Sequence, residues 1–91
     1  MRAFRIAYDG RPFHGFQRQP SVPTVEDAIF DALRALDVFE GTKPPGYSAA
    51  GRTDAGVSAR AQTVALAAPD WLTPRALNAE LPDAVRAWAD A

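Results

Sequence analysis

The sequence predicts an α+β domain in which a four-stranded antiparallel sheet carries two helices on one face. Alternating apolar and polar residues, which are typical of half-buried strands, occur at residues 2–8, 58–67 and 84–89. Two segments with helical spacing of apolar residues lie between these strands, and each begins at a threonine suited to cap a helix. With one further short strand, the predicted order is β-α-β-β-α-β.

The chain is predicted to open with a strand and a loop. Residues 2–8 alternate between two faces, one of which carries the apolar side chains of Phe4, Ile6 and Tyr8. An Asp-Gly pair ends this strand. The prolines and glycines of residues 10–23 then predict a loop.

The loop is predicted to lead into a helix over residues 24–38. Thr24 is a good N-cap, and Asp27 stands three positions on, in the place of the acid of a capping box. Acidic residues in the first turn suit the positive end of the helix dipole. Apolar residues follow at helical spacing: Val25, Ala28, Ile29, Ala32, Leu33 and Leu36.

The second half of the chain is predicted to repeat the scheme. A short strand over residues 47–50 leads into a turn, and residues 58–67 form the next strand, with Val64 and Leu66 inward. A second helix is predicted over residues 74–81, because a threonine cap is followed by proline at the first helical position.

The last strand is predicted over residues 84–89. With right-handed crossovers, this order of elements gives the ferredoxin-like fold. That fold hosts many functions, so function must be argued from the site.

Composition narrows the class of protein. Residues 1–91 suit a single domain, and 47% hydrophobic with 23% charged residues is typical of a globular chain. Without cysteine and with His14 as its one histidine, the chain is expected to hold no disulfide, no thiolate metal site and no histidine-based zinc site. No apolar run approaches the roughly 20 residues of a membrane span. The start has no signal-peptide layout, so a cytoplasmic protein is expected.

Charge is distributed unevenly, although the net charge is only −1. Residues 1–20 carry a net charge of +3 and residues 43–60 carry +2, whereas residues 24–42 carry −4. A cationic face with an acidic back suits phosphate contact on one side. Chance clustering on a small chain is the alternative.

The segment Gly51–Val57 carries the strongest chemical signal. Arg52 stands two residues before Asp54, and glycines flank the pair. Glycines permit positive φ or a close approach of the backbone. The arginine can hold the carboxylate ionised or bind a phosphate. For this motif alone, a hairpin turn with a local ion pair is the alternative.

Three ordered blocks together resemble the tRNA pseudouridine synthase A family. They read YDGRPFHGFQRQ from Tyr8, AGRTDAGV from Ala50 and LNAELP from Leu77, and the resemblance ends at Pro82. It implies an enzyme that isomerises uridine to pseudouridine in the anticodon stem-loop of tRNA, without a cofactor and as a homodimer. The reaction breaks the N1–C1′ bond and joins C5 to C1′.

The resemblance also implies roles for individual residues. Asp54 would be the nucleophile, with its point of attack (C1′ or C6) left open together with proton abstraction from the sugar. Arg52 would help to extrude the target nucleotide. Structural roles at the site are expected for Gly51, Thr53, Gly56 and Tyr8. RNA contacts are expected from Arg11, His14, Gln17, Arg18 and Arg60.

For several aromatic residues, packing is the favoured interpretation. Phe13 and Phe16 could stack on bases, but packing in the core or at a hinge is favoured. Trp71 and Trp88 are also expected to pack, and Trp88 could cover a face where a second domain docks. Ser58 departs from the histidine that is common in the family.

The family pattern continues beyond this chain. We therefore expect residues 1–91 to be the N-terminal half of a catalytic unit whose C-terminal half is absent, and to be inactive alone. A non-catalytic RNA-binding module similar to the RRM is the alternative function. Residues 60–65 lack the aromatic residues of that module, which argues against it. A pure interaction domain would leave the Arg-Thr-Asp turn unexplained.

Overall fold

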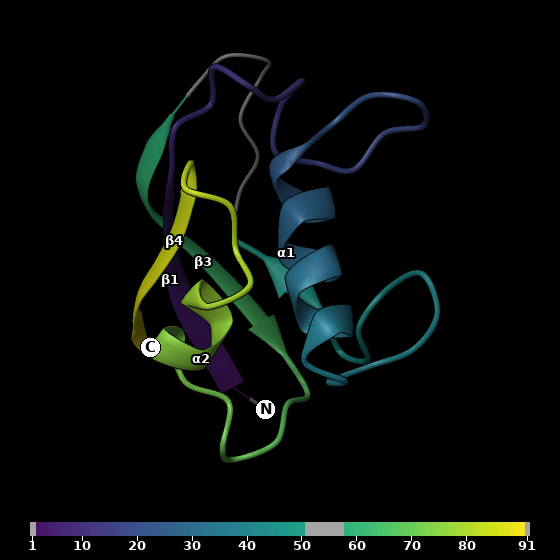
Figure 1. Ribbon diagram of the computed structural model, residues 1–91, viewed down its shortest axis with the longest axis vertical. Coiled ribbons are helices and arrows are strands. Elements are labelled where there is room, and N and C mark those ends of the chain that lie inside the picture. Colours follow the sequence, from purple (N-terminus) through teal and green to yellow (C-terminus); the bar gives the residue numbers. More distant parts are fainter. Residues whose placement is uncertain (1, 51–57, 91) are drawn as a thin grey trace.

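A computed structural model describes residues 2–50 and 58–90. The predicted order β-α-β-β-α-β is confirmed (Figure 1). Gly51–Val57 and the two terminal residues lie outside the described residues. The elements are β1 (Arg2–Tyr8), α1 (Val25–Ala35), β2 (Ser48–Ala49), β3 (Ala59–Leu66), α2 (Pro74–Asn78) and β4 (Val85–Asp90).

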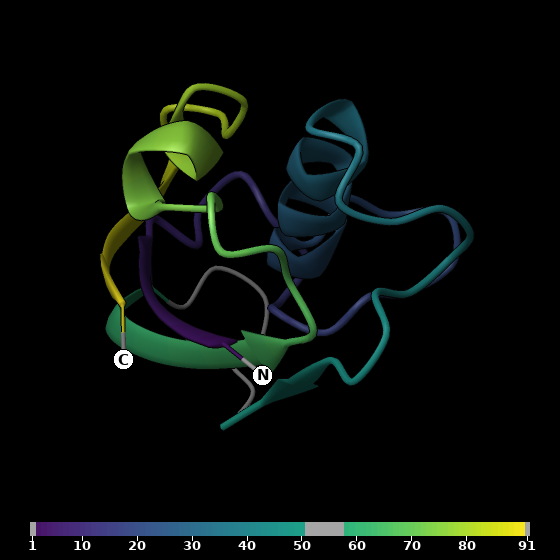
Figure 2. The same ribbon diagram turned by 90° about the horizontal axis from the view of Figure 1, so that it is seen from below.

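The four strands form one sheet in the order β2-β3-β1-β4. Every neighbouring pair is antiparallel, so β1 is central and pairs with both β3 and β4. Both helices cover the same face of the sheet (Figure 2). This is the ferredoxin-like arrangement that the sequence predicts.

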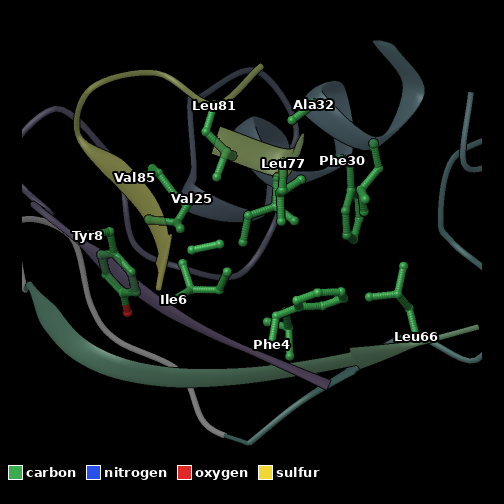
Figure 3. Packing of buried hydrophobic residues seen from close by; sticks show 14 of the residues in the cluster. Phe4, Ile6, Tyr8, Val25, Phe30, Ala32, Leu66, Leu77, Leu81 and Val85 are labelled. Atoms are coloured by element: carbon green, nitrogen blue, oxygen red, sulfur yellow. The ribbon is translucent and has the colours of Figure 1, made fainter. Parts of the chain in front are cut away.

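The core lies between the sheet and the helices (Figure 3). Phe4, Ile6 and Tyr8 of β1 are buried as predicted, and so are Val64 and Leu66 of β3. The strand register explains why the buried side chains of β1 and β3 lie in one layer, since Phe4 lies opposite Val64 across the β1–β3 pair. Side chains of one strand alternate between faces, so one face of the sheet supplies this layer.

The predicted capping box at α1 is confirmed. The Thr24 hydroxyl accepts a hydrogen bond from the Asp27 backbone N–H at 3.3 Å, and the Asp27 carboxylate accepts one from the Thr24 backbone N–H at 3.2 Å. The predicted cap of α2 is confirmed as well, because the Thr73 hydroxyl accepts from the Ala76 N–H at 3.1 Å. Each cap satisfies backbone donors that have no partner within the helix.

Both helices end earlier than predicted. Helix α1 stops at Ala35, because Leu36 leaves the helical conformation and Asp37 adopts a φ of 58°, a left-handed conformation that ends a helix. Helix α2 stops at Asn78, and the backbone N–H groups of both Glu80 and Leu81 donate to one carbonyl of the preceding turn.

The expected packing of the two tryptophans is wrong. Trp71 and Trp88 expose 54% and 53% of their surface, and the Arg5 guanidinium lies 5.8 Å from the centre of the Trp88 ring. The expected packing of the two loop phenylalanines is confirmed, since Phe16 is fully buried and Phe13 packs partly buried against the core. No helix in the described part of the chain is long and apolar enough to cross a membrane.

Candidate nucleic-acid interface

The residues predicted for catalysis do not lie in the described part of the chain. They are Arg52 and Asp54, together with the supporting residues Gly51, Thr53 and Gly56. Their neighbours on both sides are described. Ala50 precedes this segment directly and Ser58 follows it directly.

One end of the sheet brings together two residues predicted for the site. Tyr8 ends β1 and lies opposite Ala59, so that the backbone of Arg60 in β3 runs beside the end of β1. The Tyr8 ring is buried and lies 5.7 Å from the ring of Phe16. The Tyr8 ring therefore packs the end of β1 against the following loop, and its structural role at the site stays a prediction.

Residues 9–11 form a turn, here called the Asp9 turn, that is held by its neighbours. The Asp9 backbone N–H donates to the Ala84 carbonyl at 2.8 Å, and the Gly10 N–H donates to the Ser58 hydroxyl at 2.9 Å. Ser58 therefore ties this turn to the residue that follows the Gly51–Val57 segment in the sequence.

The charges of the Asp9 turn satisfy one another. The Arg11 guanidinium donates to both carboxylate oxygens of Asp9, with its Nη2 at 2.6 Å and its Nε at 2.9 Å. The Arg11 backbone N–H donates to the same carboxylate at 3.0 Å. These hydrogen bonds from Arg11 lower the pKa of Asp9 to about 2. Arg11 is exposed, as an RNA contact requires, but its charge is already paired.

The loop after this turn closes on itself and leaves its polar side chains outside. The His14 backbone N–H donates to the Pro23 carbonyl at 2.7 Å, and the Gln19 side chain donates to the His14 carbonyl at 2.9 Å. The side chains of His14 and Gln17 are exposed. Their exposure leaves the predicted RNA contacts of both residues as a prediction.

Residues 15–18 dock on the start of α1 and are here called the Glu26 loop, after the α1 residue that accepts a hydrogen bond from them. The backbone N–H groups of Val25 and Glu26 donate to the carbonyls of Gly15 and Phe16, at 3.2 and 3.0 Å. Gly15 has a φ of 95°, which favours glycine and turns the chain toward the helix. The fully buried Phe16 fixes this loop to the core.

A buried carboxylate completes this contact. Glu26 is 8% exposed, and its Oε1 accepts a hydrogen bond from the Arg18 backbone N–H at 2.8 Å. The Arg18 guanidinium lies 5.3 Å from the centre of the Phe30 ring and donates to the Thr42 carbonyl. Arg18 thus makes no ion pair with an acid in the described part of the chain.

A pocket of about 480 Å³ opens beside α1, between the Glu26 loop and the segment before β2. Both loops lie beside α1, away from β4 (Figures 1 and 2). The lining of the pocket includes Arg18, Glu26, Phe30, Lys43, Tyr47 and Ala50. The pocket therefore combines a buried carboxylate, two cations and aromatic rings, and it reaches the last described residue before Gly51.

Tyr47 gives this pocket a second polar group. Its hydroxyl oxygen is buried and faces the Glu26 carboxylate. Burial raises the pKa of Tyr47, and the nearby Glu26 carboxylate raises it further, so the phenol stays neutral. Its ring meets Phe30 edge-on, with the ring centres 4.8 Å apart.

Sequence reasoning assigned no site role to Glu26, Lys43 or Tyr47. Glu26 was expected only to suit the helix dipole, and the connector before β2 carried no motif. No local signal could have joined Glu26 and Tyr47, because 21 positions separate them and only the fold brings them together.

A second hollow of about 720 Å³ lies on the other side of the Asp9 turn. Its lining includes Tyr8, Asp9, Ser58, Asp83 and Arg86. Arg86 donates to the Asp83 carboxylate at 3.1 Å. Asp9 pairs with Arg11 and Arg86 with Asp83, so these charged groups are already satisfied within the protein.

The architecture defines a ferredoxin-like α+β domain, with a pocket beside α1 whose lining includes Arg18 and Lys43. Comparison with known proteins gives the particular family. A tRNA pseudouridine synthase A of Natronomonas pharaonis is 73% identical to this chain over 92 residues. The protein of the same name from Halobacterium salinarum is 71% identical over 90 residues, and that from Methanosarcina acetivorans is 50% identical over 91 residues.

These three alignments cover 98 to 100% of this chain but 34% of each relative. The chain thus spans about one third of the length of the curated relatives it matches. No protein-family model matches the chain. The resemblance to the tRNA pseudouridine synthase A family is confirmed over the whole chain. The chain is homologous to a segment that makes up about one third of the length of each of those proteins.

Proposed function

We propose that this chain is part of a tRNA pseudouridine synthase that isomerises uridine in the anticodon stem-loop. The observation that carries the proposal is the 71 to 73% identity, over essentially the whole chain, to proteins named tRNA pseudouridine synthase A. The AGRTDAGV segment supplies an aspartate beside an arginine, the pair that the chemistry needs.

In the proposed reaction, Asp54 acts as the nucleophile. The N1–C1′ bond breaks, the base turns, and C5 bonds to C1′. The proton on C5 is lost to solvent and N1 gains one, so the reaction is an isomerisation that needs no oxidant or metal. Arg52 is proposed to keep the carboxylate ionised and to hold the extruded nucleotide. Attack at C1′ and attack at C6 both fit this scheme.

The described loops are proposed to bind the RNA backbone around the target. Arg18 and Lys43 line the pocket next to Ala50, and neither forms an ion pair with an acid in the described part of the chain. They are better phosphate ligands than Arg11, whose charge Asp9 already balances. His14 and Gln17 are exposed on the same loop and add neutral hydrogen-bonding groups.

The alternative of an RRM-like module receives no support from the central strands β1 and β3, and the exposed Trp88 beside Arg5 lies on the edge strand β4. Such modules stack bases on aromatic side chains of the central strands. The side chains between the buried ones of β1 and β3 include Ala3, Arg5, Ala7, Thr63 and Ala65. None of these is aromatic, and the RNA contacts are therefore proposed for the loops.

We further propose that these residues work within a longer, homodimeric enzyme. The relatives are about three times as long as this chain, so other residues would complete the catalytic cleft. Residues 1–91 alone should then give no multiple turnover on tRNA. Repeated turnover by the 91-residue chain would show that the cleft is complete within it.

The central test is Asp54→Asn in the full-length enzyme. The amide keeps the shape of the side chain and removes its charge, so tritium release from C5-labelled uridine in tRNA should be abolished while tRNA binding persists. Asp70→Asn, at an exposed aspartate beside the start of β1, is the matched control and should keep full activity. Activity of Asp54→Asn within about tenfold of wild type would remove Asp54 from the nucleophile's role.

A further inference from the structure

The segment before β2 leads directly toward the predicted catalytic residues. Residues 41–47 precede this strand, and Ala50 is the last described residue before Gly51. Strand β2 has two residues and lies at the edge of the sheet, with β3 as its neighbour. A strand this short forms few backbone hydrogen bonds, so its position depends on side-chain contacts as well.

The beginning of this segment is held by two arginines. The Arg34 guanidinium of α1 donates to the Gly41 carbonyl at 3.0 Å and to the Thr42 carbonyl at 3.3 Å. The Arg18 guanidinium donates to the same Thr42 carbonyl. These hydrogen bonds are exposed and lie at the end of the segment that is farther from β2. The end nearer to β2 needs another contact with α1.

Tyr47 supplies that contact. Its ring meets Phe30 edge-on, with the ring centres 4.8 Å apart, and its buried hydroxyl faces the Glu26 carboxylate. Glu26 also accepts the Arg18 backbone N–H at 2.8 Å. One carboxylate of α1 therefore lies between the Glu26 loop and the residue that directly precedes β2.

Packing alone does not require this contact to be polar. Tyr47→Phe would keep the edge-on ring contact without burying a hydroxyl, and Glu26→Gln would still accept the Arg18 N–H without burying a charge. Each buried polar group is costly when it has no partner. Placed against each other, the phenol and the carboxylate compensate that cost and fix the direction of both side chains.

We propose that Tyr47 is a positioning residue for the isomerisation: through its contact with Glu26 and Phe30, it fixes β2 and thereby the approach of Asp54 to the bound RNA. The inference rests on the proposed function, which assigns the nucleophile's role to Asp54. Asp54 follows Tyr47 by seven positions, so Tyr47 acts on it through β2. A misplacement of about 1 Å can cost roughly 100-fold in rate, so a contact of this kind affects turnover.

The Glu26 loop has anchors of its own, so it should keep its place without the Tyr47 hydroxyl. Backbone N–H groups at the start of α1 donate to the carbonyls of Gly15 and Phe16, and the Phe16 ring is fully buried. The RNA contacts proposed for this loop should therefore persist. Loss of the hydroxyl is expected to lower kcat and to leave KM for tRNA unchanged.

The first test measures tritium release by the full-length enzyme. Tyr47→Phe should lower kcat about tenfold and keep KM for tRNA within about twofold of wild type. Glu26→Gln keeps an acceptor for the phenol and for the Arg18 N–H, so its kcat should stay within about threefold. Thr73→Ala is the matched control, because it removes a hydrogen-bonding hydroxyl at the cap of α2, away from the pocket. It should change neither constant.

A double variant separates position from charge. In Tyr47→Phe the buried Glu26 carboxylate loses its partner, and adding Glu26→Gln removes that charge. If Tyr47 acts by positioning, the double variant should still show a loss of about tenfold in kcat. Recovery of wild-type kcat would mean that the phenol only compensates the charge, which overturns the inference. The double variant also carries the test if Tyr47→Phe alone fails to fold.

The second test follows amide hydrogen exchange in the 91-residue chain and needs no activity. The Ala50 N–H donates to the Thr63 carbonyl at 2.9 Å and reports on the end of β2. Tyr47→Phe should speed its exchange about tenfold, because the short strand opens locally more often. The Leu77 N–H of α2, which donates to the Thr73 carbonyl at 3.0 Å, should keep its rate.

The outcomes separate this inference from the proposed function. Wild-type kcat in Tyr47→Phe, or unchanged exchange at Ala50, overturns the inference and leaves the isomerase proposal standing. A rise in KM that accounts for the whole loss overturns it as well, since it would place Tyr47 in RNA binding. Failure of the isomerase proposal shows separately, as full activity of Asp54→Asn. The exchange experiment then still decides whether Tyr47 fixes β2.

Discussion

The Asp9 turn and the Glu26 loop use the same parts in opposite ways. Each is held by a carboxylate that accepts a hydrogen bond from the backbone N–H of an arginine: Asp9 accepts from Arg11 within the turn, and Glu26 of α1 accepts from Arg18 of the loop. In the Asp9 turn, the guanidinium returns to the carboxylate and closes an exposed ion pair. At the Glu26 loop, the Arg18 guanidinium instead lies over the Phe30 ring and donates to the Thr42 carbonyl. The Glu26 carboxylate is buried and makes no ion pair with it.

The difference teaches which charges can serve a ligand. An exposed arginine–carboxylate ion pair contributes little to stability. A phosphate that binds such an arginine must compete with the carboxylate that is already paired with it. A buried carboxylate without a cation has the opposite property, because it gains from a donor that reaches it. The two regions thus separate a structural turn from a candidate binding pocket, although both follow from one sequence block.

The largest expected effect comes from breaking the Glu26 loop at its core anchor. Phe16→Ala should lower the free energy of unfolding by about 3 to 5 kcal/mol, because Phe16 is fully buried and its loss leaves a cavity beside Tyr8. Urea unfolding of the 91-residue chain measures the change. His14→Ala, on the same loop but exposed, should stay within about 0.5 kcal/mol of wild type. A loss below 1 kcal/mol for Phe16→Ala would mean that the loop is not anchored there.

A smaller effect is expected at the start of α1, where the Glu26 loop docks. Thr24→Ala removes the hydroxyl that accepts from the Asp27 N–H and should cost about 1 to 2 kcal/mol. Thr73→Ala provides the comparison at α2, a five-residue helix whose cap is exposed. We expect it to cost less than Thr24→Ala in the same urea experiment. Equal losses would show that the buried docking of the loop adds nothing to the cap.

The caps show what sequence can predict well. Thr24 and Asp27 are three positions apart, so their reciprocal hydrogen bonds depend on local geometry alone and follow from the pattern. The alternation in β1 likewise fixed its buried face. The end of α1 was harder to predict, because a non-glycine residue, Asp37, adopts the left-handed conformation four positions before Gly41.

The tryptophans and the pocket show where sequence reasoning stops. Hydrophobicity alone predicted packing for Trp71 and Trp88, but it does not tell whether a neighbouring element covers them, and in the structure about half of each side chain stays exposed. The meeting of Glu26 with Tyr47 depends on the placement of α1 beside the segment before β2. Distant pairs of this kind need the tertiary structure, and the meeting of this carboxylate with the phenol is seen only there.

The Asp9 turn should respond weakly to loss of its tie to Ser58. Ser58→Ala removes the hydroxyl that accepts from the Gly10 N–H and should cost about 1 kcal/mol. Ser48→Ala is the matched control, since Ser48 is exposed in β2 and its side chain makes no hydrogen bond to a described residue. Thermal unfolding of both variants measures the difference. If Ser58→Ala matches Ser48→Ala, the tie contributes nothing and water replaces it.

The smallest effect on stability is expected for Arg11→Gln, which should instead change the pKa of Asp9. Hydrogen bonds from Arg11 hold the pKa of Asp9 at about 2, so the variant should return it toward the ordinary aspartate value. Carboxyl carbon shifts followed by NMR across a pH series measure this directly. Because the folded-state pKa is depressed, the contribution of the pair is present above the unfolded-state pKa near 4 and is lost as pH falls toward about 2. Arg75→Gln removes an exposed arginine that forms no ion pair with a described acid, and it should leave the Asp9 titration unchanged. An unchanged Asp9 pKa in Arg11→Gln would show that the exposed fork does not persist in solution, and Arg11 would then be as free as Arg18 to bind a phosphate.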